Sequence, residues 1–372
     1  RTPIRRYVTL RTPIRRNNRK AEFALRDLEI LTVNEAVKNG EVATEKEIHP
    51  LYEKLLLNQF HDILPGTCIP AAHKLALEQT DWVIDTAKKL TAEKVSGEGD
   101  CITLTNTLSF DRCDPVFIEC EDGLKVDGPY KQQRFTDIDG RNILIVAGIT
   151  VPAFSTVKLN LVKGEIEEGT PFKQDGNSLE TPFAEIEFDE KGYIASFKDK
   201  DSGRELKAEN GYALNTFIMA EDLPHDWDNW DIDSDIELKF KDCAVLSSRK
   251  VVSDGAAALI IRSTYTLSEK SSILQDMIFF ADSKEVRFDT LMNWNDDHRL
   301  LKTAFDTTVR SDYARSEIQY GNALRPTTRN NSVEKAKFEI VNHKYTDLSE
   351  TRFGVSILND SKYGISKIGR AH

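Results

Sequence analysis

The segment from Asn58 to Gly66 reads NQFHDILPG and contains residue types that could do chemistry. A neutral imidazole such as that of His61 suits a zinc ion, and the carboxylate of Asp62 could bind sugar hydroxyls or orient the ring. A His-Asp pair at a helix end also has a simpler role, because the dipole at that end favours a cationic histidine. The residues alone leave both interpretations open.

A second candidate is Pro224 to Asp233, which reads PHDWDNWDID. In an extended strand, alternate side chains would project to one side: His225, Trp227, Asn229, Asp231 and Asp233. Aromatic faces beside carboxylates can stack on a sugar and bind its hydroxyls, which makes Trp227, Trp230 and Asp231 candidate sugar contacts. Calcium binding and a solvated acidic loop anchored by two tryptophans are the alternatives.

A third polar region comprises Glu317 to Asn330 and, further along the chain, Asn342 to Tyr345. Amide-rich strands of this kind can line a cleft, or they can form the outer face of a sheet. The pattern favours the outer face, because nothing in the spacing directs these side chains toward one point.

The elements that would carry these residues fall into two parts. From Ala21 to about Ser96 the apolar spacing predicts three helices. The first ends at Asn39-Gly40, the second begins at Pro50 and the third begins near Pro70, since glycine suits a helix end and proline the first helical position. Three amphipathic helices with short connections predict a small helical bundle.

After residues 96–100 the chain changes to short runs of β-branched and aromatic residues separated by turn signals. The clearest runs are Ile102–Phe110, Asn142–Val151, Thr156–Val162, Phe183–Phe188 and Ala256–Tyr265. Asp189 to Gly192 and Asp254-Gly255 are candidate hairpin turns. The fold class is therefore α+β multidomain, with antiparallel β-sandwiches after the helices. We expect four parts: an irregular lead-in 1–20, a helical domain 21–96, a small sandwich 97–165 and a large sandwich 166–372.

Composition and charge restrict the class of protein. The chain carries a net charge of −11, yet its first twenty residues hold eight Lys or Arg and no acid. The acidic remainder is a poor partner for nucleic acid. There is no apolar run of eighteen residues and no signal-peptide core, and the five cysteines form no CxxC pair. We therefore expect no membrane partner, free thiols and a cytoplasmic location.

The hexapeptide RTPIRR occurs twice, at residues 1–6 and 11–16. A basic arm that grips phosphate is one interpretation of this repeat. An irregular lead-in is the interpretation we favour, because no aromatic residues are interleaved with the basic ones.

NQFHDILPGT resembles a motif of the α-mannosidases of glycoside hydrolase family 38, bacterial and cytosolic branch. The resemblance continues in family order through most of the chain, in Asn18–Glu22, Phe183–Gly203, Trp227–Asp233, Glu317–Gly321, Arg325–Thr327 and Phe353–Gly364. It implies a β/α barrel followed by a three-helix middle domain and β-sandwich domains, the large one a galactose-mutarotase-like supersandwich. This chain resembles the part of the family that follows the barrel.

The resemblance also implies a site. Family members hold one zinc ion with a His-x-Asp pair, a nucleophilic Asp and a His of the middle domain, and that last ligand corresponds to His61. Asp62 corresponds to a sugar contact, and Phe60 stands where other branches have a second His. No segment here matches the His-x-Asp pair, the nucleophile or the acid/base carboxylate, although retaining glycosidases need two carboxyl groups about 5 Å apart.

We therefore expect the middle and carboxyl-terminal part of a zinc-dependent, retaining α-mannosidase that is not active alone. Its partners would be mannose-containing oligosaccharides and an amino-terminal barrel or a second copy of the chain. The alternative is a non-catalytic carbohydrate-binding or scaffold protein that uses Trp227 and Trp230.

Overall fold

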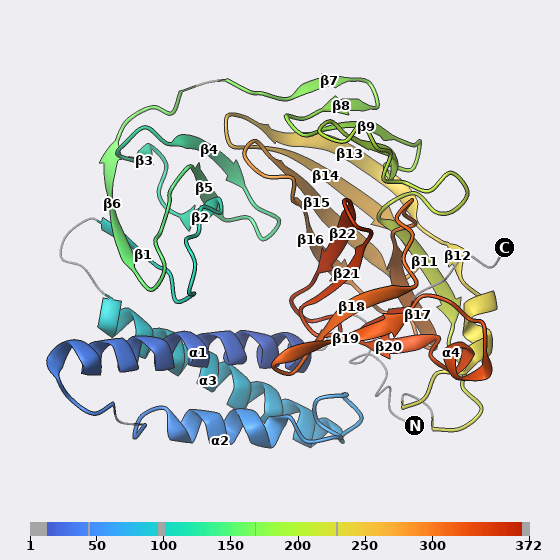
Figure 1. Ribbon diagram of the computed structural model, residues 1–372, viewed down its shortest axis with the longest axis horizontal. Helices are drawn as coiled ribbons and strands as arrows, with labels where there is room; N and C mark the ends of the chain where they lie inside the picture. Colours follow the sequence, from blue (N-terminus) through green and yellow to red (C-terminus); the bar gives the residue numbers. More distant parts are fainter. Residues whose placement is uncertain (1–12, 44, 96–100, 168, 228–229, 367–372) are drawn as a thin grey trace.

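A computed structural model describes residues 13–43, 45–95, 101–167, 169–227 and 230–366. Three helices come first along the chain, and antiparallel sheets follow them (Figure 1). The expected α+β multidomain class is confirmed. Within the described ranges, no helix combines the length and the apolar character that crossing a membrane requires.

The helices are α1 (Pro13–Asn39), α2 (His49–Asn58) and α3 (Pro70–Val95). Gly40, with φ of +69°, follows α1, and Pro50 lies in the first turn of α2, where its missing N–H is not needed. The three predicted helices are thus confirmed. However, α1 already begins at Pro13, so residues 13–20 of the predicted irregular lead-in are helical; the first RTPIRR copy lies outside the described residues.

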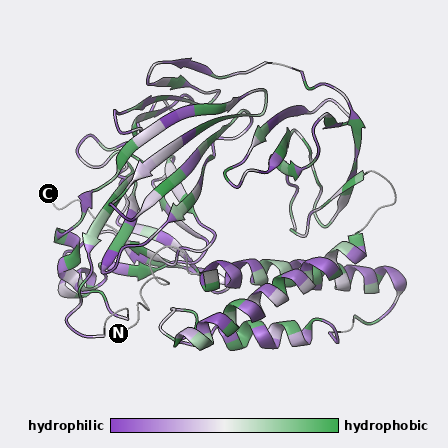
Figure 2. Cartoon of the chain, turned by 180° about the vertical axis from the view of Figure 1, so that it is seen from behind, coloured by the Kyte–Doolittle hydropathy of each residue, from purple (hydrophilic) through white to green (hydrophobic). Residues whose placement is uncertain are grey.

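The helical bundle buries one apolar face of each helix, and hydrophobic and hydrophilic residues alternate along the helices in Figure 2. Its core consists of Ala21, Leu25, Leu28, Ile48, Leu51, Leu55, Val83, Ile84 and Ala87. Residues three and four apart lie on one side of a helix, which explains why these positions converge.

The small sandwich contains β1 (Cys101–Thr105), β2 (Val116–Glu119), β3 (Leu124–Val126), β4 (Lys131–Thr136), β5 (Asn142–Ala147) and β6 (Thr156–Lys163). Its two sheets have the strand orders β1-β6-β3 and β2-β5-β4, with every pairing antiparallel. Aliphatic side chains from both sheets fill the space between them: Ile118, Val126, Leu144, Val146, Ile149, Val151 and Leu159.

The large β region starts with β7 (Lys173–Asp175), β8 (Ser178–Glu180), β9 (Ala184–Phe188), β10 (Ile194–Asp199) and β11 (Thr216–Glu221). A 3-10 helix, η2 (Ser234–Leu238), leads to β12 (Lys241–Asp242), β13 (Val245–Asp254), β14 (Ala258–Thr266), β15 (Ser272–Phe280), β16 (Val286–Asn293) and β17 (Arg299–Ala304). The chain continues with β18 (Tyr313–Ile318), β19 (Gly321–Pro326), α4 (Ser332–Ala336), β20 (Glu339–Val341), β21 (Tyr345–Ser349), β22 (Gly354–Leu358) and β23 (Gly364–Ser366).

Both predicted hairpin turns are confirmed. The Gly192 N–H donates to the Asp189 carbonyl at 3.0 Å between β9 and β10, and Gly192 has φ of +76°. The Gly255 N–H donates to the Ala258 carbonyl at 3.2 Å between β13 and β14. Turns of this kind depend on local residue chemistry, so they can be predicted without knowing the tertiary fold.

The small sandwich and the large region share a core. Phe135, Ile143, Ile145 and Ala147 of the small sandwich pack with Ala257, Ala258, Ile260, Ile278 and Phe280. Polar contacts reinforce this contact surface, because the Ala258 N–H donates to Gln133 Oε1 at 2.9 Å and Arg262 Nη2 donates to the Thr136 carbonyl at 3.1 Å. The sheets therefore form a continuous support for the polar segments described next.

Candidate functional site

His61 and Asp62 lie on the turn that follows α2. The helix ends at Asn58, and residues 59–66 form successive turns. The His61 and Asp62 side chains are 67% and 51% exposed, and His61 Nε2 lies 3.5 Å from Asp62 Oδ2. The Phe60 and His61 ring centres are 4.3 Å apart. The structure thus presents an imidazole and a carboxylate together at the surface, where both can contact a ligand.

The backbone of this turn is held while those side chains remain exposed. The Asp62 carbonyl accepts hydrogen bonds from the Thr67 N–H at 3.1 Å and the Cys68 N–H at 2.9 Å. Arg15 of α1 donates from Nε to the Leu64 carbonyl and from Nη2 to the Pro65 carbonyl, both at 3.3 Å. Because these bonds satisfy the carbonyls that a helix end leaves free, the direction of the turn is fixed.

Sequence reasoning missed a chain of amides that joins this turn to both ends of the described structure. Gln59 Nε2 donates to Asn18 Oδ1 at 3.0 Å and to Glu22 Oε1 at 3.2 Å. Asn18 Nδ2 donates to Glu22 Oε1 at 2.9 Å and to the Tyr363 hydroxyl at 3.4 Å. Asn18, Gln59 and Tyr363 each lie in a segment of the family resemblance, which was the only signal that could have related them.

The third polar region approaches α1 from the carboxyl-terminal side. Glu317 accepts hydrogen bonds from the Lys344 N–H at 2.7 Å and from Lys344 Nζ at 2.9 Å. Lys344 Nζ also lies 5.7 Å from the centre of the Phe23 ring on α1. The His343 ring packs edge-on against Tyr363 at 5.3 Å, and burial, followed by the nearby Arg19 charge, lowers the His343 pKa. Burial at this position therefore favours the neutral form of His343.

The favoured prediction of an outer sheet face for this third region was wrong in part. Much of the β19 strand is exposed, as an outer strand would be. However, residues 327–330 together with Asn342 and Lys344 line a large open cleft, along with side chains of α1, the small sandwich and β16. The cleft interpretation holds for these residues, because the segment between β19 and β21 leaves the sheet, and Lys344 at its end lies beside Phe23 of α1 before β21 pairs with β18.

Trp227, Trp230 and Asp231 lie on the loop between β11 and η2. The extended strand considered for this segment is not formed, since Trp227 has φ of +56° and the Trp230 and Asp231 N–H groups both donate to the Trp227 carbonyl. Asn229 lies outside the described residues. Trp227 and Trp230 are 73% and 55% exposed, and Asp231 is exposed. The loop thus presents two indoles to solvent, without the predicted alternation.

The structure does not join the two candidate segments. Among the described residues, no hydrogen bond or ring contact links 59–66 to the Trp227–Asp231 loop. Nor does any group of three His, Cys, Asp or Glu side chains converge as a metal site within the described ranges. His61 and Asp62 therefore do not fit a complete zinc site by themselves, since zinc takes three or four protein ligands.

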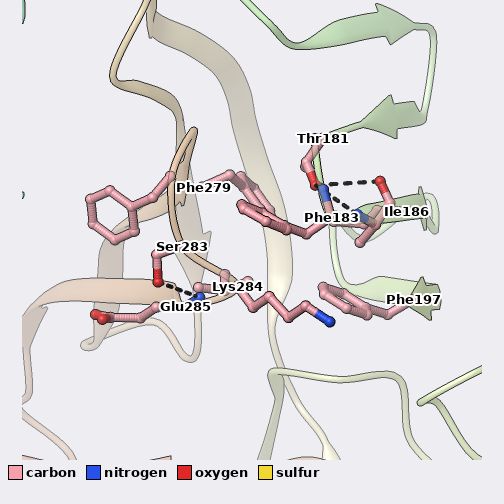
Figure 3. A pocket seen from close by; sticks show the side chains of 11 residues that line it. Thr181, Phe183, Ile186, Phe197, Phe279, Ser283, Lys284 and Glu285 are labelled. Atoms are coloured by element: carbon pink, nitrogen blue, oxygen red, sulfur yellow. Dashed lines mark hydrogen bonds between the residues drawn. The ribbon is translucent and has the colours of Figure 1, made fainter. Parts of the chain in front are cut away.

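A smaller cavity within the large β region is no alternative site. It lies between β9, β10 and the turn after β15, where Phe183 and Phe197 face Lys284 (Figure 3). Its volume is about 10 Å³, which corresponds to a single water molecule and excludes a sugar. Lys284 is in any case paired with Asp199 at 2.8 Å and Asp201 at 2.6 Å.

Two family models match this chain in the order expected. Residues 5–96 match the alpha mannosidase middle domain, and residues 179–370 match the glycosyl hydrolases family 38 C-terminal domain. The second match covers more than half of the sequence. The chain belongs to glycosyl hydrolase family 38. The family resemblance stated from the sequence is thereby confirmed.

Relatives within family 38 carry α-mannosidase names. The chain is 28% identical over 378 residues to human alpha-mannosidase 2C1, an alignment that includes 97% of this chain and 34% of the human protein. It is 28% identical over 373 residues to an alpha-mannosidase of Saccharomyces cerevisiae, covering 94% of this chain and 30% of the yeast protein. The chain therefore spans about a third of the length of these curated relatives.

Solved structures agree with this assignment at the level of the fold. The crystal structure of an alpha-mannosidase from Enterococcus faecalis V583 superposes with a TM-score of 0.74 at 14% identity, over 98% of this chain and 51% of that one. A second Enterococcus faecalis structure, described as a protein in glycosyl hydrolase family 38, gives a TM-score of 0.70. The expected fold of a helical domain followed by sandwiches is confirmed.

Proposed function

We propose that this chain supplies the middle and carboxyl-terminal parts of a zinc-dependent, retaining α-mannosidase that acts in the cytoplasm on mannose-containing oligosaccharides. The observation that carries the proposal is the His61 turn, whose backbone is fixed while its imidazole and carboxylate remain exposed. A ligand-binding pair has to satisfy both requirements, because it needs a defined direction and an open coordination or hydrogen-bonding position.

In this proposal His61 contributes one zinc ligand and Asp62 binds a sugar hydroxyl. The other zinc ligands, the nucleophile and the acid/base carboxylate would come from a segment outside these 372 residues. Zinc, when bound, supplies positive charge beside the sugar hydroxyls. The role of this chain is to hold His61 and Asp62 in position, and the Arg15 and Gln59 hydrogen bonds to the turn support that role.

The chain alone is expected to be inactive. Retention requires two carboxyl groups about 5 Å apart around the bond that is cleaved. The carboxylate beside His61 is that of Asp62. The carboxylate of Glu22 already accepts hydrogen bonds from Asn18 and Gln59. These two side chains therefore do not form the pair of carboxyl groups that retention requires.

Reading the DNA upstream of the codon for Arg1 tests the proposal first. A coding segment with a His-x-Asp motif and a barrel pattern is expected, in the same gene or in a neighbouring one. The purified chain should hydrolyse no p-nitrophenyl α-mannoside, whereas the chain joined to that segment should do so. Activity of the isolated chain, or the absence of any such segment, would contradict the proposal.

Carbohydrate binding without catalysis is a second candidate function. It is favoured by the exposure of Trp227 and Trp230 on a loop that also carries Asp231. Exposed indoles stack on the apolar face of a sugar. Calorimetry with manno-oligosaccharides would test it: binding that survives chelation and His61→Ala but is lost in Trp227→Ala supports this function, and no binding rejects it.

A further inference from the structure

Arg19 of α1 is a buried charge without a hydrogen-bonding partner among the described residues. The residue is 1% exposed, and its Nε, Nη1 and Nη2 atoms each lack an acceptor. Glu22 Oε2 lies 3.6 Å from Arg19 Nε, which is longer than a hydrogen bond, and Glu22 Oε1 already accepts from Asn18 and Gln59. Glu22 therefore balances part of the Arg19 charge through an ion pair, but the buried guanidinium N–H groups still lack acceptors, and an acceptor supplied by a ligand would stabilise this arrangement.

The surroundings of Arg19 are cationic. The guanidinium carbons of Arg19 and Arg15 lie 5.3 Å and 6.0 Å from the centre of the same Tyr363 ring. Desolvation lowers the pKa of Lys362, and Arg15 and Arg16 lower it further against the opposing effect of Asp360. Desolvation likewise lowers the pKa of Arg15. The net charge of the chain is −11, so a group of cations that repel one another is unexpected in it.

The position of these residues on the helix adds to the excess of positive charge. Arg15, Arg16 and Arg19 occupy the start of α1, and the first turn of α1 contains no acidic residue. The amino-terminal end of a helix carries a partial positive charge and favours anions. Arg15 and Arg16, which lie in the first turn, therefore repel the helix dipole, and a bound anion would offset this effect.

A small anion can approach this cluster from the open cleft. Arg16, Phe23 and Lys362 line the cleft. The exposed Phe23 ring covers Arg19, with its centre 5.9 Å from the guanidinium carbon. Figure 1 shows the start of α1 beside the carboxyl-terminal strands. An anion in the cleft would meet Arg16 and Lys362, and the Phe23 side chain would have to rotate to admit it to Arg19.

We propose that Arg19, together with Arg15 and Lys362, binds a phosphate group, either as inorganic phosphate or as a phosphate monoester on a sugar. The guanidinium fork matches the oxygen geometry of phosphate, and a dianion balances several cations at once. Part of the second RTPIRR copy thus contributes to an anion site, as the phosphate-gripping interpretation of that repeat had suggested. This binding does not depend on the α-mannosidase proposal.

Titration of the full chain with inorganic phosphate, in a chloride buffer free of sulfate, tests the site. Isothermal calorimetry and phosphorus NMR should show saturable binding of one phosphate with a Kd below about 1 mM. Arg19→Gln should weaken it at least about tenfold. Arg26→Gln is the matched control, because Arg26 lies on the exposed side of the same helix, paired with Asp27 and Thr107, and should bind phosphate like the wild type.

Mannose 6-phosphate and mannose distinguish the source of the phosphate. Tighter binding of mannose 6-phosphate than of inorganic phosphate indicates a sugar phosphate, and equal binding indicates recognition of the phosphate group alone. Displacement of phosphate by mannose itself would overturn the proposal. So would a titration without saturable phosphate binding, or an Arg19→Gln variant that binds phosphate as tightly as the wild type. If Arg19→Gln does not fold, Lys362→Gln decides: binding weakened at least about threefold supports the site, and unchanged binding overturns it.

Discussion

The His61 turn and the Trp227–Asp231 loop are both exposed polar segments, but they are held very differently. The His61 turn receives hydrogen bonds from Arg15 and is joined through Gln59 and Asn18 to Tyr363, so residues of α1 and of the carboxyl-terminal segment fix it. The Trp loop is bonded within itself, through the Trp227 carbonyl and through Asp233, which accepts from the His225 N–H at 2.7 Å.

This difference separates two kinds of recognition. A turn fixed from outside can present one ligand to a metal at a defined position. The Trp227–Asp231 loop, whose described hydrogen bonds lie within the loop and its flanking residues, can adapt its indoles to a bound sugar, although the loop must then become ordered on binding. The comparison supports the proposal that the His61 turn carries the chemistry and that the Trp227–Asp231 loop is a contact surface.

The base of the Trp loop, in contrast to its tip, is firmly anchored. Phe217 of β11 packs edge-on against Tyr193 at 6.1 Å and Tyr265 at 5.2 Å, and the two tyrosines stack at 5.7 Å. Strand β11 leads directly into the loop. Loosening this aromatic cluster should therefore affect the loop before it affects the His61 turn.

Alkaline pH gives the largest predicted effect. Burial raises the pKa of Tyr265 to about 12, so the folded state keeps its proton between pH 10 and 12 while the unfolded state releases it. Protonated Tyr265 contributes its full stabilisation below pH 10. This contribution to the free energy of unfolding, about 2–3 kcal/mol in total, is lost as the pH rises through 12. Urea unfolding at several pH values measures it, and Tyr265→Phe should flatten the profile. An unchanged slope in that variant would contradict the assignment.

Removing the central amide of the His61 network should give the next largest effect. Asn18→Ala removes the hydrogen bonds that join Gln59, Glu22 and the Tyr363 hydroxyl through one amide, while the Gln59–Glu22 bond remains, and should lower the free energy of unfolding by about 1–3 kcal/mol. The adjacent Asn17→Ala is the matched control. Asn17 bonds Thr80 and Asp81 in a more exposed position, so its loss should be about 1 kcal/mol or less. Equal losses in the two variants would show that the network does not fix the turn.

Arg15→Gln should have a smaller effect, confined to the turn. It removes the donors to the Leu64 and Pro65 carbonyls and should lower stability by about 1 kcal/mol. Hydrogen exchange by mass spectrometry should show faster exchange in residues 59–68, with α3 unchanged. Faster exchange throughout the helical bundle would indicate a general loss of folding and contradict a local role.

Trp227→Ala should have the smallest effect on stability. Because its side chain is 73% exposed, the change should alter the free energy of unfolding by about 0.5 kcal/mol or less. A thermal melt measures this. A loss above about 2 kcal/mol would show that the loop is as firmly held as the His61 turn and would remove the contrast between them.

Local chemistry explains what the sequence could predict. Gly40, Pro50 and the Asp189–Gly192 turn end or begin elements through their own backbone preferences, so these positions were found without a fold. The contact of Asn18 with Tyr363 joins residues 345 positions apart, and no spacing rule reaches that far. The helical start at Pro13 was missed because a basic repeat without apolar periodicity resembles an irregular segment.

Local sequence patterns do not show tertiary structure, and this explains the errors about the candidate sites. Alternation along PHDWDNWDID assumed an extended backbone, and the positive φ of Trp227 invalidates it. The Glu317 and Asn342 segments were assigned to an outer face because their approach to α1 depends on how the chain turns after β19, which is a tertiary feature. His61 and Asp62 could be proposed from the sequence because their motif is contiguous, and their roles stay a prediction.

Metal analysis of the proposed complete enzyme, in which this chain would be joined to a catalytic segment, tests the central claim most directly. His61→Ala is compared with His49→Ala, which removes an exposed histidine of α2 that is paired with Glu53. We expect one zinc ion in the wild type and in His49→Ala, and loss of zinc together with at least about 100-fold of the α-mannosidase activity in His61→Ala. Full zinc content and full activity in His61→Ala would contradict the account.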